Sequence, residues 1–220
     1  MLIVSFDCYG TIIDWEKGIV NTIRKVFPDS HLSYAEILNM YAEIESKLEK
    51  HYRPYREILR DVMIEFANSL NREISSEEEL ALVKSLPEWP AFDDSRDALR
   101  RIKKLAKIAI ISNVDNDLIA KTIENLGVKF DLVITAEMVG AYKPSLSVFK
   151  YAQRVFNVTK NEWLHAAQSV YHDIAPCRKL GIKTALIKRR GHGATPKAKG
   201  DGDLSFNDLS EFADFLERLK

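Results

Sequence analysis

Side chains that can carry out covalent chemistry follow several short apolar segments of the sequence. Asp7 comes directly after the first apolar run, Lys143 lies in the middle of the chain, and Asp173 follows a later run. A carboxylate can attack an electrophilic centre, while a lysine and a second acid balance charge and position water. This combination is typical of a covalent hydrolytic site. The polar residues that follow the apolar runs are Asp7, Tyr9, Thr11, Ser112, Asn113, Asp115, Lys143, Ser169, Tyr171, His172 and Asp173.

The main candidates also have purely structural interpretations. Asp7 can cap a turn, Ser112 and Asn113 can begin a helix, and Asp173 can serve as a helix N-cap. Lys143 can be a solvated loop lysine. Their occurrence together, in this order and after apolar runs, favours a functional site over four unrelated structural roles.

Five short apolar runs rich in β-branched residues predict buried strands. Helical patterns alternate with the later runs, and such alternation with short connections predicts an α/β fold with a doubly wound parallel sheet. Ligands bind outside the carboxyl ends of the strands in such sheets, which is where the polar residues stand. The predicted strands are Leu2–Phe6, Ile108–Ile111, Leu132–Thr135, Leu164–Gln168 and Thr184–Ile187, and the predicted helices among them are Ser95–Leu105, Asp117–Leu126, Leu146–Phe156 and Ala175–Leu180.

Residues 15–92 break this alternation because they carry helical patterns and no strand pattern. Ser33–Glu36 and Ser75–Glu78 both match capping boxes that open helices. A segment of about 75 residues is far longer than a plain crossover connection. We therefore predict a helical cap domain over 15–92, inserted after the first strand, and a core domain formed by 1–14 and 93–220.

The composition excludes several classes of partner. The 32 basic and 32 acidic side chains give a formal net charge of +0, so no basic excess predicts binding to nucleic acid. No window approaches the roughly 18 apolar residues of a membrane span, and no basic segment typical of a signal peptide precedes the first apolar run. Cys8 and Cys177 cannot form a disulfide scaffold. We predict a cytoplasmic protein with no nucleic-acid or membrane partner, and an exposed loop over Gly191–Gly202.

Four motifs resemble those of the haloacid dehalogenase superfamily: Asp7–Thr11, Ile111–Asn113, Lys143–Pro144 and a final Asp173. The resemblance spans the whole chain, and residues 15–92 resemble the helical cap of that superfamily. It implies a doubly wound core, an aspartate nucleophile and a homodimer as a possible assembly.

Tyr9 distinguishes two branches of this superfamily. Its phosphatases carry a second aspartate two residues after the nucleophile, which protonates the leaving alcohol. A phenol, with an ordinary pKa of about 10, is a poor proton donor near neutral pH, whereas a halide leaving group needs no proton. The Asp-x-Tyr-Gly-Thr pattern is similar to that of the L-2-haloacid dehalogenase branch.

This resemblance implies hydrolytic dehalogenation of short 2-haloalkanoic acids, without a cofactor. Asp7 would attack the α-carbon and expel halide, leaving an ester that water then hydrolyses. Asp173 would orient the water, and Lys143 would balance the charge of Asp7 and of the substrate. Thr11 would position Asp7, and Ser112 would bind the substrate carboxylate. The remaining substrate contacts would come from Tyr9, Asn113 and Ser169.

The chain departs from the dehalogenase pattern in three places. Met40–Glu45 contains no counterpart of the cap arginine that helps the halide leave, so Arg53 or Arg56 is the candidate replacement. Phe149 stands where a tyrosine is expected. In the fourth motif, Gln168–Asp173, a glutamine replaces the first serine and a valine replaces an asparagine.

Two alternatives stay open. One is a magnesium-dependent phosphatase acting on a small phosphate ester, with Mg²⁺ held by Asp7 and Asp173. The other is a non-catalytic binding module that has kept the fold.

Two neighbours of the acids also have competing interpretations. His172 can be a base for the water step or a local hydrogen-bonding group. Cys8 is expected to be a packed, unreactive thiol.

Overall fold

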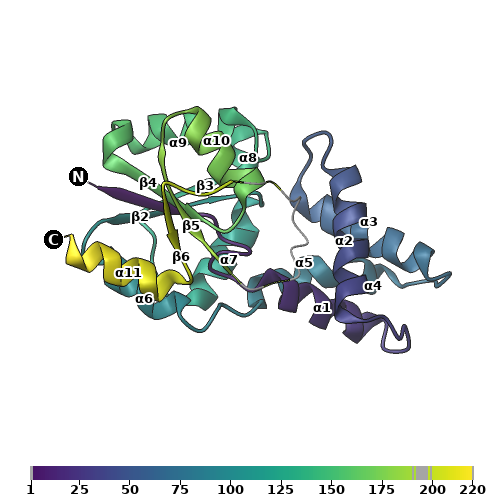
Figure 1. Ribbon diagram of the computed structural model, residues 1–220. Coiled ribbons are helices and arrows are strands. Elements are labelled where there is room, and N and C mark those ends of the chain that lie inside the picture. Colours follow the sequence, from purple (N-terminus) through teal and green to yellow (C-terminus); the bar gives the residue numbers. More distant parts are fainter. Residues whose placement is uncertain (1, 190, 192–197, 199, 220) are drawn as a thin grey trace.

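The protein is built around a six-stranded parallel sheet, seen in a computed structural model that describes residues 2–189, 191, 198 and 200–219. The strand order is β3-β2-β1-β4-β5-β6, and all neighbouring strands run parallel (Figure 1). The order reverses between β1 and β4, which creates the crevice where doubly wound folds bind ligands. The strands are β1 (Ile3–Phe6), β2 (Lys107–Ser112), β3 (Leu132–Thr135), β4 (Trp163–Ala167), β5 (Lys183–Ile187) and β6 (Leu204–Phe206).

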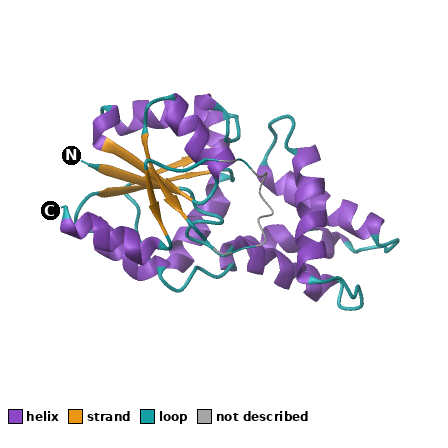
Figure 2. Ribbon diagram, in the orientation of Figure 1, coloured by secondary structure: helices purple, strands orange, loops and turns teal. Residues whose placement is uncertain are grey.

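Helices cover both faces of the sheet, which is why its strands are apolar along their whole length. On one face, residues of α6, α7 and α11 pack with Val4, Phe6 and Ile110 in the larger core. On the other face, α9 and α10 pack with Ile3, Ile111 and Trp163 (Figure 2). The helices of this part are α6 (Ser95–Lys103), α7 (Asn116–Leu126), α8 (Ala136–Val139), α9 (Leu146–Phe156), α10 (Ala175–Lys179) and α11 (Leu209–Arg218).

The predicted fold class is confirmed, and each of the five predicted strands ends within one residue of its expected bounds. The four predicted helices are also present. The sequence analysis missed β6 and α11. β6 is too short to show a clear alternation of apolar and polar residues. The loop predicted over Gly191–Gly202 lies largely outside the described residues. Cys8 is buried, and burial raises the pKa of its thiol, as expected of a packed side chain.

Residues 15–92 form the group of helices beside the carboxyl edge of the sheet (Figure 1). The capping boxes at Ser33 and Ser75 are confirmed at the starts of α2 and α4. The chain leaves and re-enters the core side by side, since Ile13 forms an antiparallel bridge with Ala91. The division into core and cap at residues 14 and 92 stays a prediction. These helices are α1 (Trp15–Val26), α2 (Tyr34–Leu48), α3 (Tyr55–Ser69), α4 (Ser76–Glu79) and α5 (Ala81–Ser85), followed by a 3₁₀ turn over Leu86–Glu88.

The buried apolar residues of 15–92 are continuous with the larger core, and they gather where α2 and α3 turn their apolar stripes toward each other and toward α1. Ile37, Tyr41, Val62 and Phe66 are fully buried there, and Phe66 stacks on Phe27. Within the described residues, no helix is long and apolar enough to cross a membrane.

Candidate active site

The carboxyl ends of β1, β2 and β4 bring the predicted polar residues to one edge of the sheet. Asp7 directly follows β1, and Ser112 is the last residue of β2. Asp173 lies in a wide helical turn, Val170–Ile174, shortly after β4. Because β1 and β4 are neighbours where the strand order reverses, Asp7 and Asp173 flank the crevice of the sheet.

Lys143 joins the two acids. Its Nζ atom donates to Asp7 Oδ1 at 2.8 Å, to Asp173 Oδ1 at 2.7 Å and to the carbonyl oxygen of Ile111 at 3.0 Å. The residue is only 2% exposed, so water does not screen these contacts. All three ammonium hydrogens are used, and the cation is held in place between the two carboxylates.

Asp7 is held in one orientation by groups on both of its oxygens. Thr11 Oγ1 donates to Asp7 Oδ2 at 2.7 Å, while Lys143 contacts the other oxygen. The Thr11 hydroxyl in turn accepts from the backbone N–H of Gln168 at 2.9 Å. Burial raises the pKa of Asp7, against the opposing charge of the Lys143 ammonium. The predicted positioning role of Thr11 agrees with this geometry.

A buried chain of hydrogen bonds, formed by Trp163, Ser5 and His165, holds the Asp173 carboxyl in position. His165 Nε2 lies 2.9 Å from Asp173 Oδ1, and His165 Nδ1 lies 2.7 Å from Ser5 Oγ. Trp163 Nε1 donates to Ser5 Oγ at 2.7 Å, so the serine hydroxyl is free to donate to Nδ1. A neutral imidazole with its proton on Nε2 therefore satisfies the whole chain.

The state of Asp173 follows from these partners. Burial alone raises the pKa of this carboxyl, but the Lys143 charge and the His165 hydrogen bond outweigh burial and lower it to about 2. Asp173 is thus a carboxylate near neutral pH. Its second oxygen, Oδ2, is buried and has no hydrogen-bond partner among the described residues.

Ser112 and Asn113 are adjacent in sequence but differ in their contacts. The Ser112 hydroxyl is buried, and no described group bonds to it. Asn113 uses both ends of its amide: its Nδ2 donates to the carbonyl of Lys143 at 3.0 Å, and its Oδ1 accepts from the Lys143 N–H at 2.7 Å. Asn113 therefore fixes the backbone of Lys143, and Ser112 has a hydroxyl left for a ligand.

Tyr9 points its hydroxyl away from Asp7. The Tyr9 and Thr122 hydroxyls are 2.8 Å apart, and Thr122 Oγ1 donates to the carbonyl of Leu118, so Tyr9 is the donor of the pair. Its ring meets Trp89 edge to face at 6.0 Å between centroids. Burial raises the pKa of the phenol well above its ordinary value. Tyr9 contributes a ring to the site, with its proton committed elsewhere.

Ser169 and His172 complete the core side of the site. Ser169 Oγ accepts from the backbone N–H of His172 at 3.0 Å and lies 3.2 Å from His172 Nδ1. Burial lowers the pKa of His172 to about 4, so its imidazole is neutral near pH 7. Ser169 thus shapes the turn that carries Asp173.

The core and cap residues together enclose a pocket of about 100 Å³ above Asp7. The core supplies Asp7, Tyr9, Ser112, Asn113, Lys143, Gln168, Ser169, His172 and Asp173. The cap supplies Trp15, Ala42, Glu45, Ser46, Glu49 and Tyr55. Seven of the eight predicted site residues line this pocket, and the eighth, Thr11, contacts Asp7 from below.

Comparison with known proteins agrees with this arrangement. The model of the haloacid dehalogenase-like hydrolases matches residues 1–181. The chain belongs to this family. An (S)-2-haloacid dehalogenase of Pseudomonas sp. (strain YL) is 22% identical over 205 residues, which are 88% of this chain and 87% of that protein.

The relatives do not all have the same activity. A glyceraldehyde 3-phosphate phosphatase of Methanocaldococcus jannaschii is 33% identical over 93 residues, 41% of this chain and 40% of that protein. The structure of L-2-haloacid dehalogenase from Xanthobacter autotrophicus superposes with a TM-score of 0.84 at 17% identity, covering 100% of both chains. At such identity the superposition establishes the fold of this hydrolase and leaves its substrate to the residues of its pocket.

The hydrolase carries neither candidate arginine in the pocket. Arg53 pairs with Asp61 at 2.5 Å, and Arg56 pairs with Asp115 at 3.1 Å and with Asp117. Both cations are thereby held by acids that do not line the pocket. The pocket wall formed by the cap instead carries two acids and two aromatic residues that the sequence analysis missed.

Phe149, which stands where the family pattern has a tyrosine, is fully buried beneath the site. Its ring meets the His165 imidazole edge to face at 5.4 Å between centroids. The residue therefore packs the imidazole against Asp173 without adding a hydrogen bond. Because this aromatic ring shields His165 from solvent, water does not compete for the hydrogen bonds of His165 with Ser5 and Asp173.

Two acids, Asp7 and Asp173, are the side chains of this site that could bind a metal ion. Within the described part of the chain, no group of three or more His, Cys, Asp or Glu side chains is placed to hold a metal. Asp7 and Asp173 remain, and the free, buried Oδ2 of Asp173 is a suitable oxygen. Mg²⁺ is often held by one or two carboxylates plus water and substrate oxygens, so these two residues would hold it.

Proposed function

We propose that this hydrolase cleaves the carbon–halogen bond of short 2-haloalkanoic acids through an ester on Asp7. The observation that carries the proposal is the state of Tyr9. At the position from which an acid would protonate a leaving alcohol, the chain has a phenol whose proton is bonded to Thr122 and whose pKa is raised. A halide ion leaves without a proton, so this arrangement suits a carbon–halogen bond.

In the first step, an oxygen of Asp7 attacks the α-carbon, and the carbon–halogen electron pair leaves with the halide. The Ser112 hydroxyl, which has no partner among the described residues, donates to the substrate carboxylate. Lys143, 2.8 Å from Asp7 Oδ1, balances the charge of the nucleophile and substrate together. Fixed contacts on both Asp7 oxygens keep the attacking group aligned.

In the second step, water attacks the carboxyl carbon of the Asp7 ester and the bond to the alkyl oxygen breaks. Asp173 Oδ2, buried and without another partner in the described chain, accepts a hydrogen bond from this water and orients it. One water proton ends on the hydroxyl of the 2-hydroxy acid, and the second is released when Asp7 ionises again. Neutral His172 lines the same pocket and can relay that proton.

The test is halide release from L-2-chloropropionate in the presence of EDTA, measured for wild type and for Asp7→Asn. We expect release by the wild type and none by the variant, with both proteins equally folded by circular dichroism. A single turnover in ¹⁸O-water should place the label on Asp7 and leave the first product unlabelled. A folded wild type that releases no halide would sink the proposal.

A second candidate is a magnesium-dependent phosphatase, favoured by the free Oδ2 of Asp173 and by the similarity to a phosphatase of Methanocaldococcus jannaschii. Mg²⁺ held by Asp7 and Asp173 would neutralise charge on a phosphate group. Hydrolysis of p-nitrophenyl phosphate with Mg²⁺, abolished by EDTA, would support this candidate. Equal phosphate release with and without EDTA, or no release, would count against it.

A further inference from the structure

The cap wall of the pocket carries two carboxyl groups that the proposed reaction does not use. Glu45 and Glu49 lie one turn apart on one face of α2 and its C-terminal end, and both line the pocket that Asp7 closes from below. The Tyr41 and Tyr55 hydroxyls donate to Glu45 Oε1 at 2.8 Å and 2.6 Å. This carboxyl is therefore held in one orientation, with its Oε2 left for another group.

No cation of the described chain balances these two acids. The basic residues near them in sequence do not serve this role, since Lys47 pairs with Glu43, Arg53 pairs with Asp61, and Lys50 does not line the pocket. Among the described lining residues Lys143 is the only lysine or arginine, and its ammonium is shared by Asp7 and Asp173. The cap end of the pocket therefore has two carboxyl groups and no basic partner among the described residues. Burial raises the pKa of both, so without a ligand they hold protons that the charge of a bound cation would displace.

The opposite end of the same pocket supplies independent evidence for a ligand. The Ser112 hydroxyl is 1% exposed, lines the pocket and has no partner within the described residues. A buried hydroxyl without a partner costs free energy, so a bound group is expected to complete it. The pocket thus presents a hydrogen-bond donor at its core end and acceptors at its cap end.

We propose that Glu45 and Glu49 bind a protonated amino group at the end of the substrate remote from Asp7, so that the substrate is a small amino acid derivative with its carboxylate at Ser112. The ammonium group has three donors for the free carboxyl oxygens, and it supplies the positive charge that this wall lacks. A methyl group at the same place would leave the two acids without a cation. This inference rests on the proposed function only in placing the reacting end of the substrate at Asp7.

The test is calorimetric binding to the wild type, with probes that carry no leaving group. The probes are 3-aminopropionate, 4-aminobutyrate and 5-aminopentanoate, each compared with the unsubstituted carboxylate of equal chain length. We expect one amino acid to bind about ten- to a hundredfold more tightly than its partner, as for a charge-assisted hydrogen bond. Equal or weaker binding of all three would overturn the inference.

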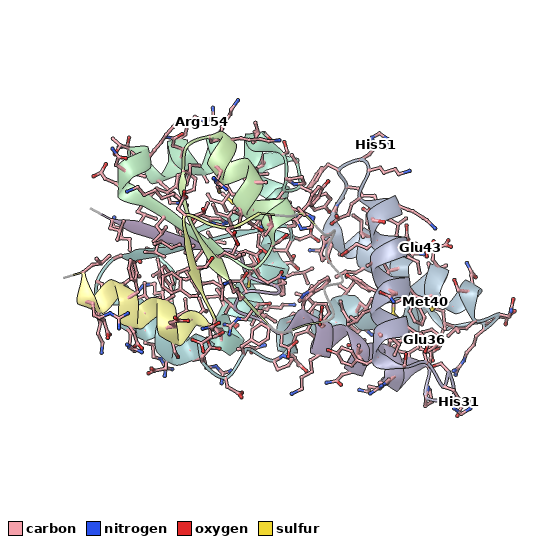
Figure 3. All side chains as sticks on the ribbon, in the orientation of Figure 1. His31, Glu36, Met40, Glu43, His51 and Arg154 are labelled. Atoms are coloured by element: carbon pink, nitrogen blue, oxygen red, sulfur yellow. The ribbon has the colours of Figure 1, made fainter. Side chains whose placement is uncertain are left out.

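Variants distinguish an effect of Glu45 and Glu49 on binding from an effect of acidic residues of the cap in general. Glu45→Gln and Glu49→Gln, singly and together, should abolish the preference for the amino acid, since glutamine keeps the shape and loses the charge. Glu43→Gln is the matched control on the same helix, because Glu43 is 70% exposed and lies outside this pocket (Figure 3). A preference that persists in the double variant, or that Glu43→Gln also removes, would refute a role for this wall.

These results are independent of turnover. If the wild type releases halide from L-2-chloropropionate but shows no preference for the amino probes, the proposed reaction stands and this inference fails. If it prefers the amino probes but releases no halide, the specificity wall stands and the reaction must be sought on another bond.

Discussion

Replacing Lys143 by methionine would show how much of the fold depends on one buried cation. Its Nζ lies 2.8 Å from Asp7 and 2.7 Å from Asp173. At an effective dielectric constant of about 20, each contact corresponds to about 6 kcal/mol of Coulomb energy. Desolvation of the three charges offsets much of this, and removal of one partner from a buried ion pair leaves a net loss of about 3–5 kcal/mol.

We expect that loss in the free energy of unfolding of Lys143→Met, measured by urea denaturation near neutral pH. Without the ammonium, the folded-state pKa of Asp7, which burial already raises, rises further, and that of Asp173 rises above its unfolded value. The penalty is then largest at neutral pH, and it shrinks as the pH falls toward about 5 because the folded form takes up protons first.

In the wild type, the contribution of Asp173 to stability should instead decrease at acid pH. The pKa of Asp173 is lowered from 3.8 to about 2, so this carboxyl stabilises the fold above pH 3.8 and loses that contribution as the pH falls to about 2. Lys84→Met is a suitable control, because the exposed pair of Lys84 with Glu77 is worth at most about 1 kcal/mol. A loss below about 1 kcal/mol for Lys143→Met, or an equal loss at both pH values, would refute the reasoning.

Three further predictions use other features of the site and the cap. Ser112→Ala should raise KM for the substrate about tenfold or more without lowering the unfolding free energy, since the buried hydroxyl has no partner among the described residues and its removal costs the fold nothing. An unchanged KM would contradict this. Burial and the charge of Glu45 raise the pKa of Glu49 from 4.5 to about 9, so the folded protein binds the extra proton and stability should fall as the pH rises from about 5 to about 9. That decline should be reduced in Glu49→Gln when melting temperatures are compared across this range, and parallel curves would argue against it. In Gly18→Ala the new Cβ would lie 2.2 Å from Trp89 Cγ. The resulting repacking should lower the unfolding free energy, measured by urea denaturation, by about 1–3 kcal/mol. An unaltered urea midpoint would show that Trp89 can move aside at no cost.

The residues that could be predicted from the sequence are those whose position follows from strand geometry alone. Asp7 and Ser112 stand at the ends of apolar runs, and parallel strands bring their carboxyl ends to one edge of the sheet. Asp173 follows a third such run. Once the strands were recognised, the convergence of these side chains required no knowledge of tertiary packing.

His165 could not be identified in this way. It lies inside β4, and its importance depends on its register with Ser5 of β1, because the two residues are direct neighbours across the sheet. A single sequence contains no measure of which residues of two strands lie side by side. The chain of hydrogen bonds from Trp163 to Asp173 therefore becomes visible only in the folded protein.

Glu45 was missed for a different reason. Charged residues on a helix usually face water, and the chain has 32 acidic side chains among which nothing marks this one. Its inward position is decided by α3, whose Tyr55 hydroxyl donates to it at 2.6 Å. The same limit applies to Arg56, since its partners Asp115 and Asp117 become its neighbours only when α3 has packed.

Asp115, a residue of the core, contributes to the placement of Glu45 through Tyr55. Asp115, which follows β2, accepts hydrogen bonds from the backbone N–H groups of Tyr55 at 2.8 Å and Arg56 at 2.9 Å. These are unpaired donors of the first turn of α3, where a carboxylate is also favoured by the helix dipole. Because Tyr55 in turn orients Glu45, the core fixes the acid that faces the nucleophile across the pocket. Asp115 thus links the end of β2 to the start of α3 and, through Tyr55, to an acid that lines the cap side of the pocket.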